Sequence, residues 1–186
     1  YAVSNDLLAV LRLSKEIAIE SGGVFDVTIG PVVNLWGFGP GRFEQGSLLP
    51  SDNAIKNAMT NVGVENLILN IANSEISKTK SIKIDLSGIA KGYAVDQVAV
   101  YLESHGVTNY FIEIGGEIKV SGLKPGNLDW VPAIETPLDG PVKVYEVLTN
   151  RGEKIALAGS GDYRNFFELD GVRYSHEIDP RTGKPV

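Results

Sequence analysis

Apolar residues at the start of the chain recur every three or four positions, which is the spacing of one face of a helix. The pattern runs from Leu7 to Ala18, Ser4 precedes it as a suitable N-cap, and Gly22-Gly23 ends it. We therefore predict an amphipathic helix over roughly residues 5–20.

The following segment, residues 23–41, contains too many glycines and prolines for a regular helix or strand. We predict that it forms a structured loop. Its aromatic residues Trp36 and Phe38 either cover an edge of the core, as aromatic side chains commonly do, or belong to a binding site.

Helical spacing returns after Pro50-Ser51-Asp52, a sequence that typically begins a helix, and continues to Gly63. Residues 67–71 and the alternating residues 82–86 then have the pattern of strands. The polar segment 72–80 between them is predicted to be the turn of a hairpin. The sequence thus predicts a helix followed by two paired strands.

A glycine-containing turn follows the second of these strands and leads into a helical pattern that ends at Gly106. The first N–H groups of a helix are unpaired and attract phosphate, and Lys91 in the first turn would add a full positive charge. The glycine spacing matches neither a Walker A loop nor a dinucleotide-binding turn. The junction is therefore either a phosphate site or a tight strand–helix connection. Asp85 either belongs to that site or is an acidic residue favoured near a helix start.

From Asn109 onward, short strand patterns alternate with turn residues, as in an antiparallel sheet. The predicted strands are residues 110–114, 117–121, 130–135, 142–149, 155–159, 166–169 and 172–178. The pair Gly115-Gly116 either lets another group approach the backbone or forms a β-bulge. Arg164 pairs with either a phosphate or a local carboxylate. Together with the helices, these strands predict an α+β fold.

Composition narrows the classes of function. The chain has 186 residues, 43% of them hydrophobic and 22% charged, which suits one soluble globular domain without a membrane-spanning segment. Its net charge of -6 argues against nucleic acid or an anionic membrane surface as a partner, because both favour a basic surface. The absence of cysteine excludes disulfides, thiolate metal ligands and cysteine nucleophiles. Because the chain begins with Tyr1 rather than Met, we expect a preceding segment.

One of the two histidines, His176, lies just before Asp179-Pro180-Arg181-Thr182-Gly183, where proline and glycine favour a rigid turn. A histidine exchanges protons near neutral pH, and a rigid turn beside it would fix the direction of its ring. His176 is therefore either a residue at the end of a strand or a general base.

Five segments, in the same order, resemble one family over nearly the whole chain. They include the sequences Gly-Val-Phe-Asp-Val-Thr, Asp-Leu-Ser-Gly-Ile-Ala-Lys-Gly, Ile-Gly-Gly-Glu, Ser-Gly-Asp-Tyr-Arg-Asn and Ser-His-Glu-Ile-Asp-Pro. On these motifs the chain resembles the ApbE family, the FAD:protein FMN transferases. The resemblance implies a single α+β domain over residues 1–186, with an antiparallel sheet, packed helices and FAD in a cleft between two lobes. It also implies that the chain is incomplete, without an N-terminal flavin-contacting loop and a C-terminal magnesium-binding segment.

The reaction that the resemblance implies depends on Mg²⁺. FAD is split at its pyrophosphate, FMN is joined through a phosphoester to a threonine hydroxyl of an acceptor protein, and AMP leaves. By the same resemblance, His176 is the general base and Gly88 offers a backbone carbonyl to Mg²⁺. The implied FAD contacts are Val24, Phe25, Asp26, Asp85, Lys91 and Ile178.

The resemblance further implies an acceptor that is a flavoprotein subunit of a membrane redox complex, of the sodium-pumping NADH:quinone reductase or Rnf type. The expected location is the bacterial periplasm, with a lipid anchor upstream of the given chain that holds a lipoprotein at the inner membrane. The alternatives are an FAD pyrophosphatase that gives FMN and AMP, a non-catalytic FAD-binding protein, and an interaction module.

Overall fold

A computed structural model describes residues 1–40, 49–137, 141 and 143–186 of the chain. The chain divides into two compact units, which we call unit 1 (Tyr1–Gly88 and Arg164–Val186) and unit 2 (Ile89–Tyr163). Both units contain α-helix and antiparallel strand pairs, so the predicted α+β class is confirmed. Within the described ranges, no helix has both the length and the apolar composition that a membrane span requires.

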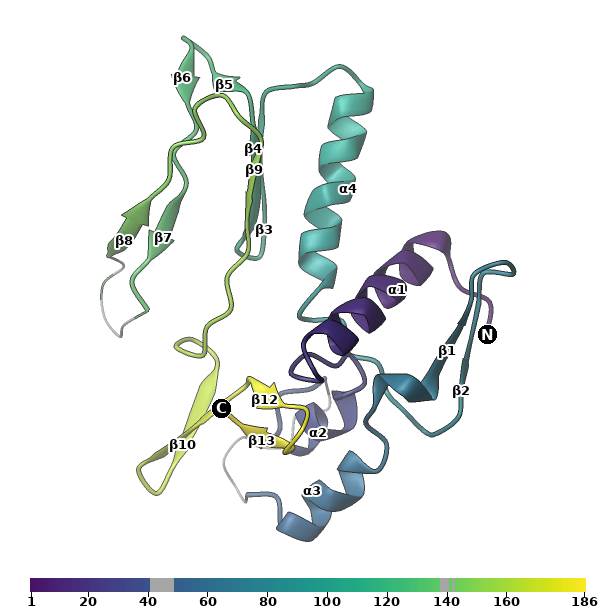
Figure 1. The fold of residues 1–186 in the computed structure, drawn as a ribbon. Helices are drawn as coiled ribbons and strands as arrows, with labels where there is room; N and C mark the ends of the chain where they lie inside the picture. Colours follow the sequence, from purple (N-terminus) through teal and green to yellow (C-terminus); the bar gives the residue numbers. More distant parts are fainter. Residues whose placement is uncertain (41–48, 138–140, 142) are drawn as a thin grey trace. The chain divides into compact units, whose positions relative to one another are not determined.

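Unit 1 combines helices with three short antiparallel hairpins (Figure 1). Its helices are α1 (Asn5–Glu20), α2 (Gly30–Leu35) and α3 (Asp52–Met59), followed by a 3-10 turn at Val64–Asn66. Its strands are β1 (Leu67–Asn70), β2 (Glu75–Lys78), β10 (Phe166–Leu169), β11 (Val172–Ser175), β12 (Ile178–Asp179) and β13 (Lys184–Pro185). The hairpins pair β1 with β2, β10 with β11, and β12 with β13.

The helix predicted over residues 5–20 is confirmed as α1. Its N-cap is Ser4, whose Oγ accepts a hydrogen bond from the backbone N–H of Leu7 at 3.1 Å and so satisfies one donor of the first turn. Leu11 lies on its inner face, fully buried in a core cluster with Leu67 and Ile82. Because these contacts exclude water from apolar side chains, they fix α1 against the β1–β2 region.

The loop predicted for residues 23–41 is wrong over residues 30–35, which form α2. Pro31 lies in the first turn of this helix. A proline is accepted there because the first N–H groups of a helix have no intrahelical partner and because its fixed φ suits the helix. Residue 41 lies outside the described residues.

The strand predicted for residues 82–86 is also wrong. The partner of β1 is β2, which lies inside the segment predicted as a turn, with Leu67 opposite Lys78 and Asn70 opposite Glu75. The alternation at residues 82–86 instead reflects burial, since Ile82 is 1% exposed in the core. Only one isolated parallel bridge, between Lys83 and Ile29, is formed by this segment among the described residues.

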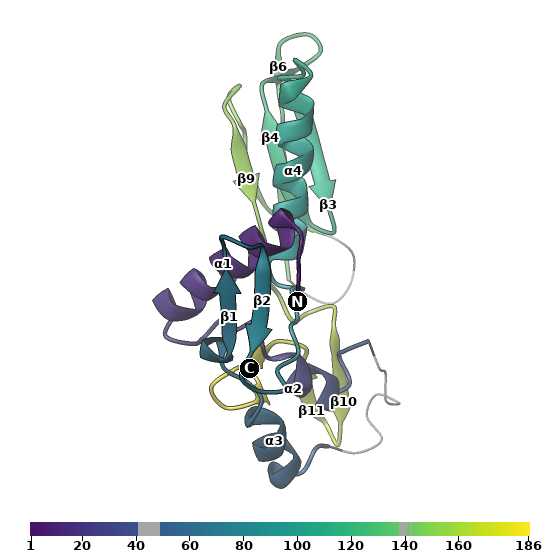
Figure 2. The same ribbon diagram turned by 90° about the vertical axis from the view of Figure 1, so that its right-hand side faces the viewer.

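Unit 2 places one long helix against a three-stranded antiparallel sheet (Figures 1 and 2). The helix is α4 (Ala90–Ser104), and the sheet has the order β3 (Tyr110–Ile114), β4 (Glu117–Ser121), β9 (Ile155–Leu157). Two further hairpins pair β5 (Leu123–Lys124) with β6 (Leu128–Asp129) and β7 (Ala133–Glu135) with β8 (Val144–Val147). The core of the unit consists of Val95 and Ala99 from α4 packed with Tyr110 and Ile112 from β3.

The predicted strands 110–114, 117–121 and 166–169 are confirmed, whereas 130–135 and 155–159 are shorter in the structure. The predicted strand 172–178 is broken after Ser175 and resumes at Ile178. The predicted strand 142–149 is present as the shorter β8, and residue 142 lies outside the described residues. The first part of the predicted strand 130–135 is not a strand, because the N–H of Trp130 donates to Oδ1 of the buried Asn150 at 2.8 Å instead of to a neighbouring strand.

Candidate functional site

The loop after α1 is organised by the carboxylate of Asp26, which is buried. One oxygen, Oδ1, accepts hydrogen bonds from the N–H and the hydroxyl of Thr28 at 2.8 and 2.7 Å. The other, Oδ2, accepts from the N–H of Val64 at 2.9 Å, and the hydroxyl of Thr28 accepts from the N–H of Gly63 at 2.7 Å. Asp26 therefore ties this loop to a segment far along the chain. Sequence spacing contained no signal for that contact.

The two residues before Asp26 present their side chains at the surface to different degrees. Val24 is 54% exposed and Phe25 is half-buried. A Cβ built on Gly88 would lie 3.2 Å from Cε2 of Phe25, so the ring lies directly against this glycine. The structure thus brings together a residue predicted to contact FAD and the residue predicted to contact Mg²⁺.

A backbone hydrogen bond also joins the same two loops. The N–H of Asp85 donates to the carbonyl of Val27 at 2.7 Å, while Oδ1 of Asp85 accepts from the N–H of Ser87 at 2.9 Å. The carboxylate therefore holds the turn that leads to the exposed Gly88. Val24, Phe25, Asp26, Asp85 and Gly88 all belong to this pair of adjacent loops in unit 1.

His176 lies between β11 and β12, in the gap of the predicted strand. Its N–H donates to the carbonyl of Asn165 at 3.1 Å, and the edge of its ring contacts Phe38, with 6.2 Å between ring centroids. Its Nδ1 is buried and has no hydrogen-bond partner among the described residues. An unpaired buried nitrogen costs about 1–3 kcal/mol, so its retention calls for a functional explanation.

The wall beside His176 is a row of stacked aromatic rings that the sequence did not predict as a unit. Phe38 stacks on Phe167 at 5.6 Å, Phe167 on Tyr174 at 5.1 Å, and Tyr174 on Trp36 at 5.8 Å between centroids. Phe167 and Tyr174 face each other because they are partners in the β10–β11 register. Trp36 is buried in the core, so it covers the core edge, and Ile178 packs on the same cluster.

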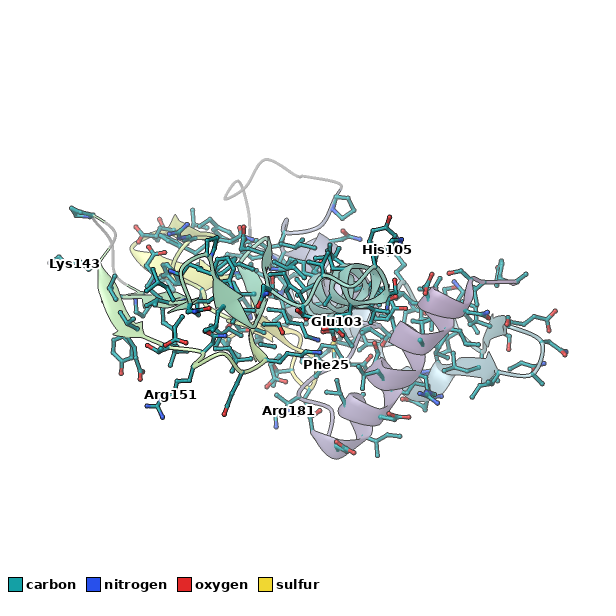
Figure 3. All side chains as sticks on the ribbon, turned by 90° about the horizontal axis from the view of Figure 1, so that it is seen from above. Phe25, Glu103, His105, Lys143, Arg151 and Arg181 are labelled. Atoms are coloured by element: carbon teal, nitrogen blue, oxygen red, sulfur yellow. The ribbon has the colours of Figure 1, made fainter. Side chains whose placement is uncertain are left out.

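The turn predicted after His176 is present. The N–H of Gly183 donates to the carbonyl of Asp179 at 2.8 Å, and Nε1 of Trp36 donates to the carbonyl of Gly183 at 2.8 Å. Arg181 reaches back to the carboxylate of Asp179, and this hydrogen bonding holds the pKa of Asp179 below its usual value. Arg181 also lies beside the loop that carries Phe25, since its Cγ is 3.9 Å from the position of a Cβ on Gly23 (Figure 3).

Lys91 belongs to unit 2, where it lies in the first turn of α4 as predicted. Its Nζ donates to the carbonyl of Gly115 at 2.9 Å and lies 2.8 Å from Oε2 of Glu117. The alternative of a β-bulge at Gly115-Gly116 is wrong. Ile114 pairs with Glu117, and both glycines have positive φ, which together describe a two-residue hairpin turn.

The described residues offer only part of a coordination shell for Mg²⁺. Mg²⁺ prefers about six oxygen ligands and commonly keeps several places for water and substrate phosphates. The exposed turn at Gly88 supplies a backbone carbonyl, and the carboxylate of Asp85 lies three residues away in sequence. No group of three or more His, Cys, Asp or Glu side chains that could hold a metal occurs within the described residues. The chain therefore fits a partial site that substrate phosphates and further ligands would have to complete.

Comparisons with known proteins cover the whole chain. A family model described as the ApbE family matches residues 1–186. The chain is 44% identical over 186 residues to the FAD:protein FMN transferase of Vibrio cholerae, a match that covers 100% of this chain and 54% of the relative. It is 39% identical over 187 residues to the transferase of the same name from Haemophilus influenzae, with 99% and 53% covered.

Solved structures give the same result for the fold. The ApbE protein from Thermotoga maritima matches with a TM-score of 0.88 at 34% identity, covering 100% of this chain and 58% of that chain. The flavin transferase ApbE from Vibrio cholerae matches with a TM-score of 0.85 at 41% identity, covering 100% and 57%. The chain spans about half the length of the curated relatives it matches.

Proposed function

The chain belongs to the ApbE family, and we propose that it serves the Mg²⁺-dependent transfer of FMN from FAD to a threonine hydroxyl of an acceptor protein, with release of AMP. The observation that carries the proposal is the match over the whole chain, at 44% identity, to a protein named FAD:protein FMN transferase. Because the chain spans about half of that relative, the proposal concerns the full-length protein.

In the proposed reaction, the oxygen of the acceptor hydroxyl forms a bond to the phosphorus of the FMN half of FAD. The bond from that phosphorus to the bridging oxygen breaks, and AMP leaves with the bridging oxygen. His176 takes the proton of the hydroxyl, which is a poor nucleophile while it remains neutral. The unpaired Nδ1 of His176 supports this role, because no described residue competes for the nitrogen.

Other residues of the chain bind or orient in this proposal. Val24 and Phe25 contact the flavin nucleotide from an exposed loop, and Lys91 places positive charge near a phosphate. Asp26 and Asp85 act through the loops that they hold, and Ile178 acts through the aromatic wall. Bound Mg²⁺, with the carbonyl of Gly88 among its ligands, would offset the negative charge of the pyrophosphate. The FAD site is proposed to be a cleft between two lobes of one domain.

The acceptor and the location are proposed on the family resemblance. The acceptor would be a flavoprotein subunit of a membrane redox complex, of the sodium-pumping NADH:quinone reductase or Rnf type. The protein would act in the periplasm of a bacterium, held at the inner membrane by a lipid anchor.

One incubation tests the reaction. Full-length protein, FAD and Mg²⁺ are mixed with an acceptor domain that contains the target threonine, and intact masses are measured. We expect the acceptor to gain the mass of one FMN with release of AMP. Free FMN and AMP beside an unmodified acceptor would establish a pyrophosphatase instead, and unchanged FAD that still binds would establish a non-catalytic flavin-binding protein. A matched reaction with an acceptor whose threonine is replaced by valine shows whether the hydroxyl is the nucleophile.

A further inference from the structure

The ammonium group of Lys91 is held by a hairpin turn of its own unit. Nζ contacts the carbonyl of Gly115 at 2.9 Å and the carboxylate of Glu117 at 2.8 Å. An ammonium has three N–H donors, of which the carbonyl of Gly115 takes one. The contact with Glu117 is an ion pair, because Oε2 of Glu117 makes no hydrogen bond among the described residues, so at least one donor remains for a ligand. Exposure favours such a ligand, since the side chain of Lys91 is 44% exposed whereas that of Glu117 is 12% exposed.

The turn is built so that the lysine stem can cross it. Gly115 has φ +58°, and a Cβ at this position would lie 3.0 Å from Cδ of Lys91. A glycine is therefore required both by the backbone conformation and by the close passage of the side chain. Glu113 fixes the turn further, because its Oε1 accepts from the N–H of Gly116 at 2.7 Å.

A second lysine pair between α4 and β4 has the opposite arrangement. Lys119 lies 2.5 Å from Oδ1 of Asp96, but here the lysine side chain is 19% exposed and the carboxylate 56% exposed. This pair presents its acid to solvent, whereas the pair of Lys91 and Glu117 presents its ammonium. Glu117 also lines a cavity of about 210 Å³ between α4, β4 and β9.

We propose that Glu117 and Gly115 are positioning residues that hold Lys91 in place for a phosphate group of the nucleotide substrate. An unrestrained lysine loses side-chain entropy when it is fixed. The turn imposes this restriction before the substrate arrives, so the remaining donor already has a fixed direction. The inference rests on the proposed function for the identity of the phosphate ligand, while the holding of Lys91 can be tested without any reaction.

The first test measures the reactivity of Lys91 in the full-length protein. Lysines are labelled briefly with acetic anhydride and quantified by peptide mass spectrometry, with Lys154 as the internal reference. Lys154 is 49% exposed and also paired, with Glu103 at 2.6 Å, so it matches Lys91 except for the glycine turn. We expect Lys91 to react more slowly than Lys154 and Glu117→Gln to speed its labelling about three- to tenfold, because the ion pair that holds the ammonium is lost.

Inorganic pyrophosphate serves as the probe of the phosphate role. We expect it to slow the labelling of Lys91 in the wild type and to leave Lys154 unchanged. If Glu117→Gln leaves the labelling of Lys91 unchanged, Glu117 does not hold the lysine and the inference is overturned. If pyrophosphate protects neither lysine or both alike, the phosphate role is overturned.

The second test is a double-mutant cycle of FMN transfer. Glu117→Gln should lower kcat/KM about tenfold in the wild-type background and change it little in a Lys91→Met background, because the effect passes through the lysine. Lys154→Gln is the matched control and should leave transfer unchanged. Equal losses in both backgrounds would show a general structural effect of Glu117 and overturn the assignment. If the wild type transfers no FMN, the proposed function fails while the labelling result still decides whether Lys91 is held.

Discussion

The candidate site residues of the two units differ in their burial and in their hydrogen-bond partners. In unit 1, the carboxylates of Asp26 and Asp179 are occupied by neighbouring donors, while Nδ1 of His176 is buried without a described partner. In unit 2, Lys91 is exposed and yet contacts the carbonyl of Gly115 and the carboxylate of Glu117. An unpaired buried atom lowers stability, so Nδ1 of His176 calls for an explanation, and proposed chemistry supplies one. Oε2 of Glu117 is also buried without a hydrogen bond, but the charge of Lys91 lies 2.8 Å from it. Residue type alone does not separate these roles.

The largest expected effect comes from removing the unpaired nitrogen of unit 1. His176→Ala should lower FMN transfer about a hundred- to ten-thousandfold, the usual contribution of a general base, and leave FAD affinity within about threefold. The matched control is His105→Ala in unit 2, because Nδ1 of His105 already lies 2.8 Å from the carbonyl of Tyr101 (Figure 3 labels this histidine). Transfer rates and FAD titrations are measured on both variants. Undiminished transfer by His176→Ala would remove the main functional difference between the units.

The second prediction compares the buried polar hubs of the two units. Asp26→Ala strands the N–H groups of Thr28 and Val64, and Asn150→Ala strands the N–H of Trp130 and two carbonyls. Each should cost about 1–3 kcal/mol of unfolding free energy, because a buried polar side chain is lost and the partly buried groups it served lose their partner.

The chain has two tryptophans, which allow the units to be followed separately in these experiments. Trp36 lies in unit 1 and Trp130 in unit 2, so Trp130→Phe and Trp36→Phe backgrounds report one unit each during urea unfolding. We expect Asp26→Ala to lower the midpoint reported by Trp36 more than that reported by Trp130, and Asn150→Ala to do the reverse. Equal shifts at both probes would mean that the two units unfold as one.

Local spacing predicted the elements whose contacts are close in sequence. Helix α1 and strands β3 and β4 have the predicted bounds, because capping and the two-residue turn act within a few residues. Helix α2 was missed because the glycines and prolines of its segment favoured a loop. Pro31, however, lies in the first turn, where a helix accepts a proline. Residues 82–86 were predicted as a strand because their apolar residues alternate. Such a pattern indicates which side chains are buried, but it does not show whether another strand pairs with the segment.

For the candidate site, the sequence indicated candidate residues but not what each of them contacts. The turn after His176 followed from Pro180 and Gly183. The bond from Asp26 to Val64 and the hold of Glu117 on Lys91 join residues 38 and 26 positions apart (64 minus 26, and 117 minus 91), so no local pattern carries them. The aromatic wall had a weak signal, since Phe167 and Tyr174 face each other across a hairpin.

The third prediction concerns Gly183 in unit 1, where neighbouring side chains leave no room for a Cβ. Gly183 has φ +69°, and a Cβ there would lie 2.8 Å from Cγ2 of Ile55 and 3.0 Å from Sδ of Met59. Gly183→Ala should cost about 2–3 kcal/mol, from backbone strain of about 1–2 kcal/mol and overpacking. Gly22→Ala is the matched control, since Gly22 has φ +63° with nothing within 4 Å. Equal losses at the two sites would show that the packing around Gly183 relaxes.

The fourth prediction separates the units at alkaline pH. Burial and the hydrogen bond to Glu103 raise the pKa of Tyr110 in unit 2 from 10.0 to about 12. A folded pKa above the unfolded value means that stability is fully present below about pH 10 and is lost as the pH rises toward 12. The midpoint reported by Trp130 should therefore fall in this range, and Tyr110→Phe should reduce the slope. A fall that is equally steep in Tyr110→Phe would assign it to another group.

The smallest expected effect concerns the ion pair beside His176 in unit 1. Hydrogen bonds from Arg181 lower the pKa of Asp179, so its stabilisation is present above the unfolded value near pH 4 and is lost as the pH falls through the folded pKa. Because Arg181 is 57% exposed, water screens the pair, and its contribution to stability should be small. Arg181→Gln should lower the Trp36 midpoint at pH 7, and the difference from the wild type should be smaller at an acid pH at which the Asp179 carboxyl is protonated. A difference of equal size at both pH values would mean that Arg181 acts by covering Gly23, so that packing rather than charge supports the turn that orients His176.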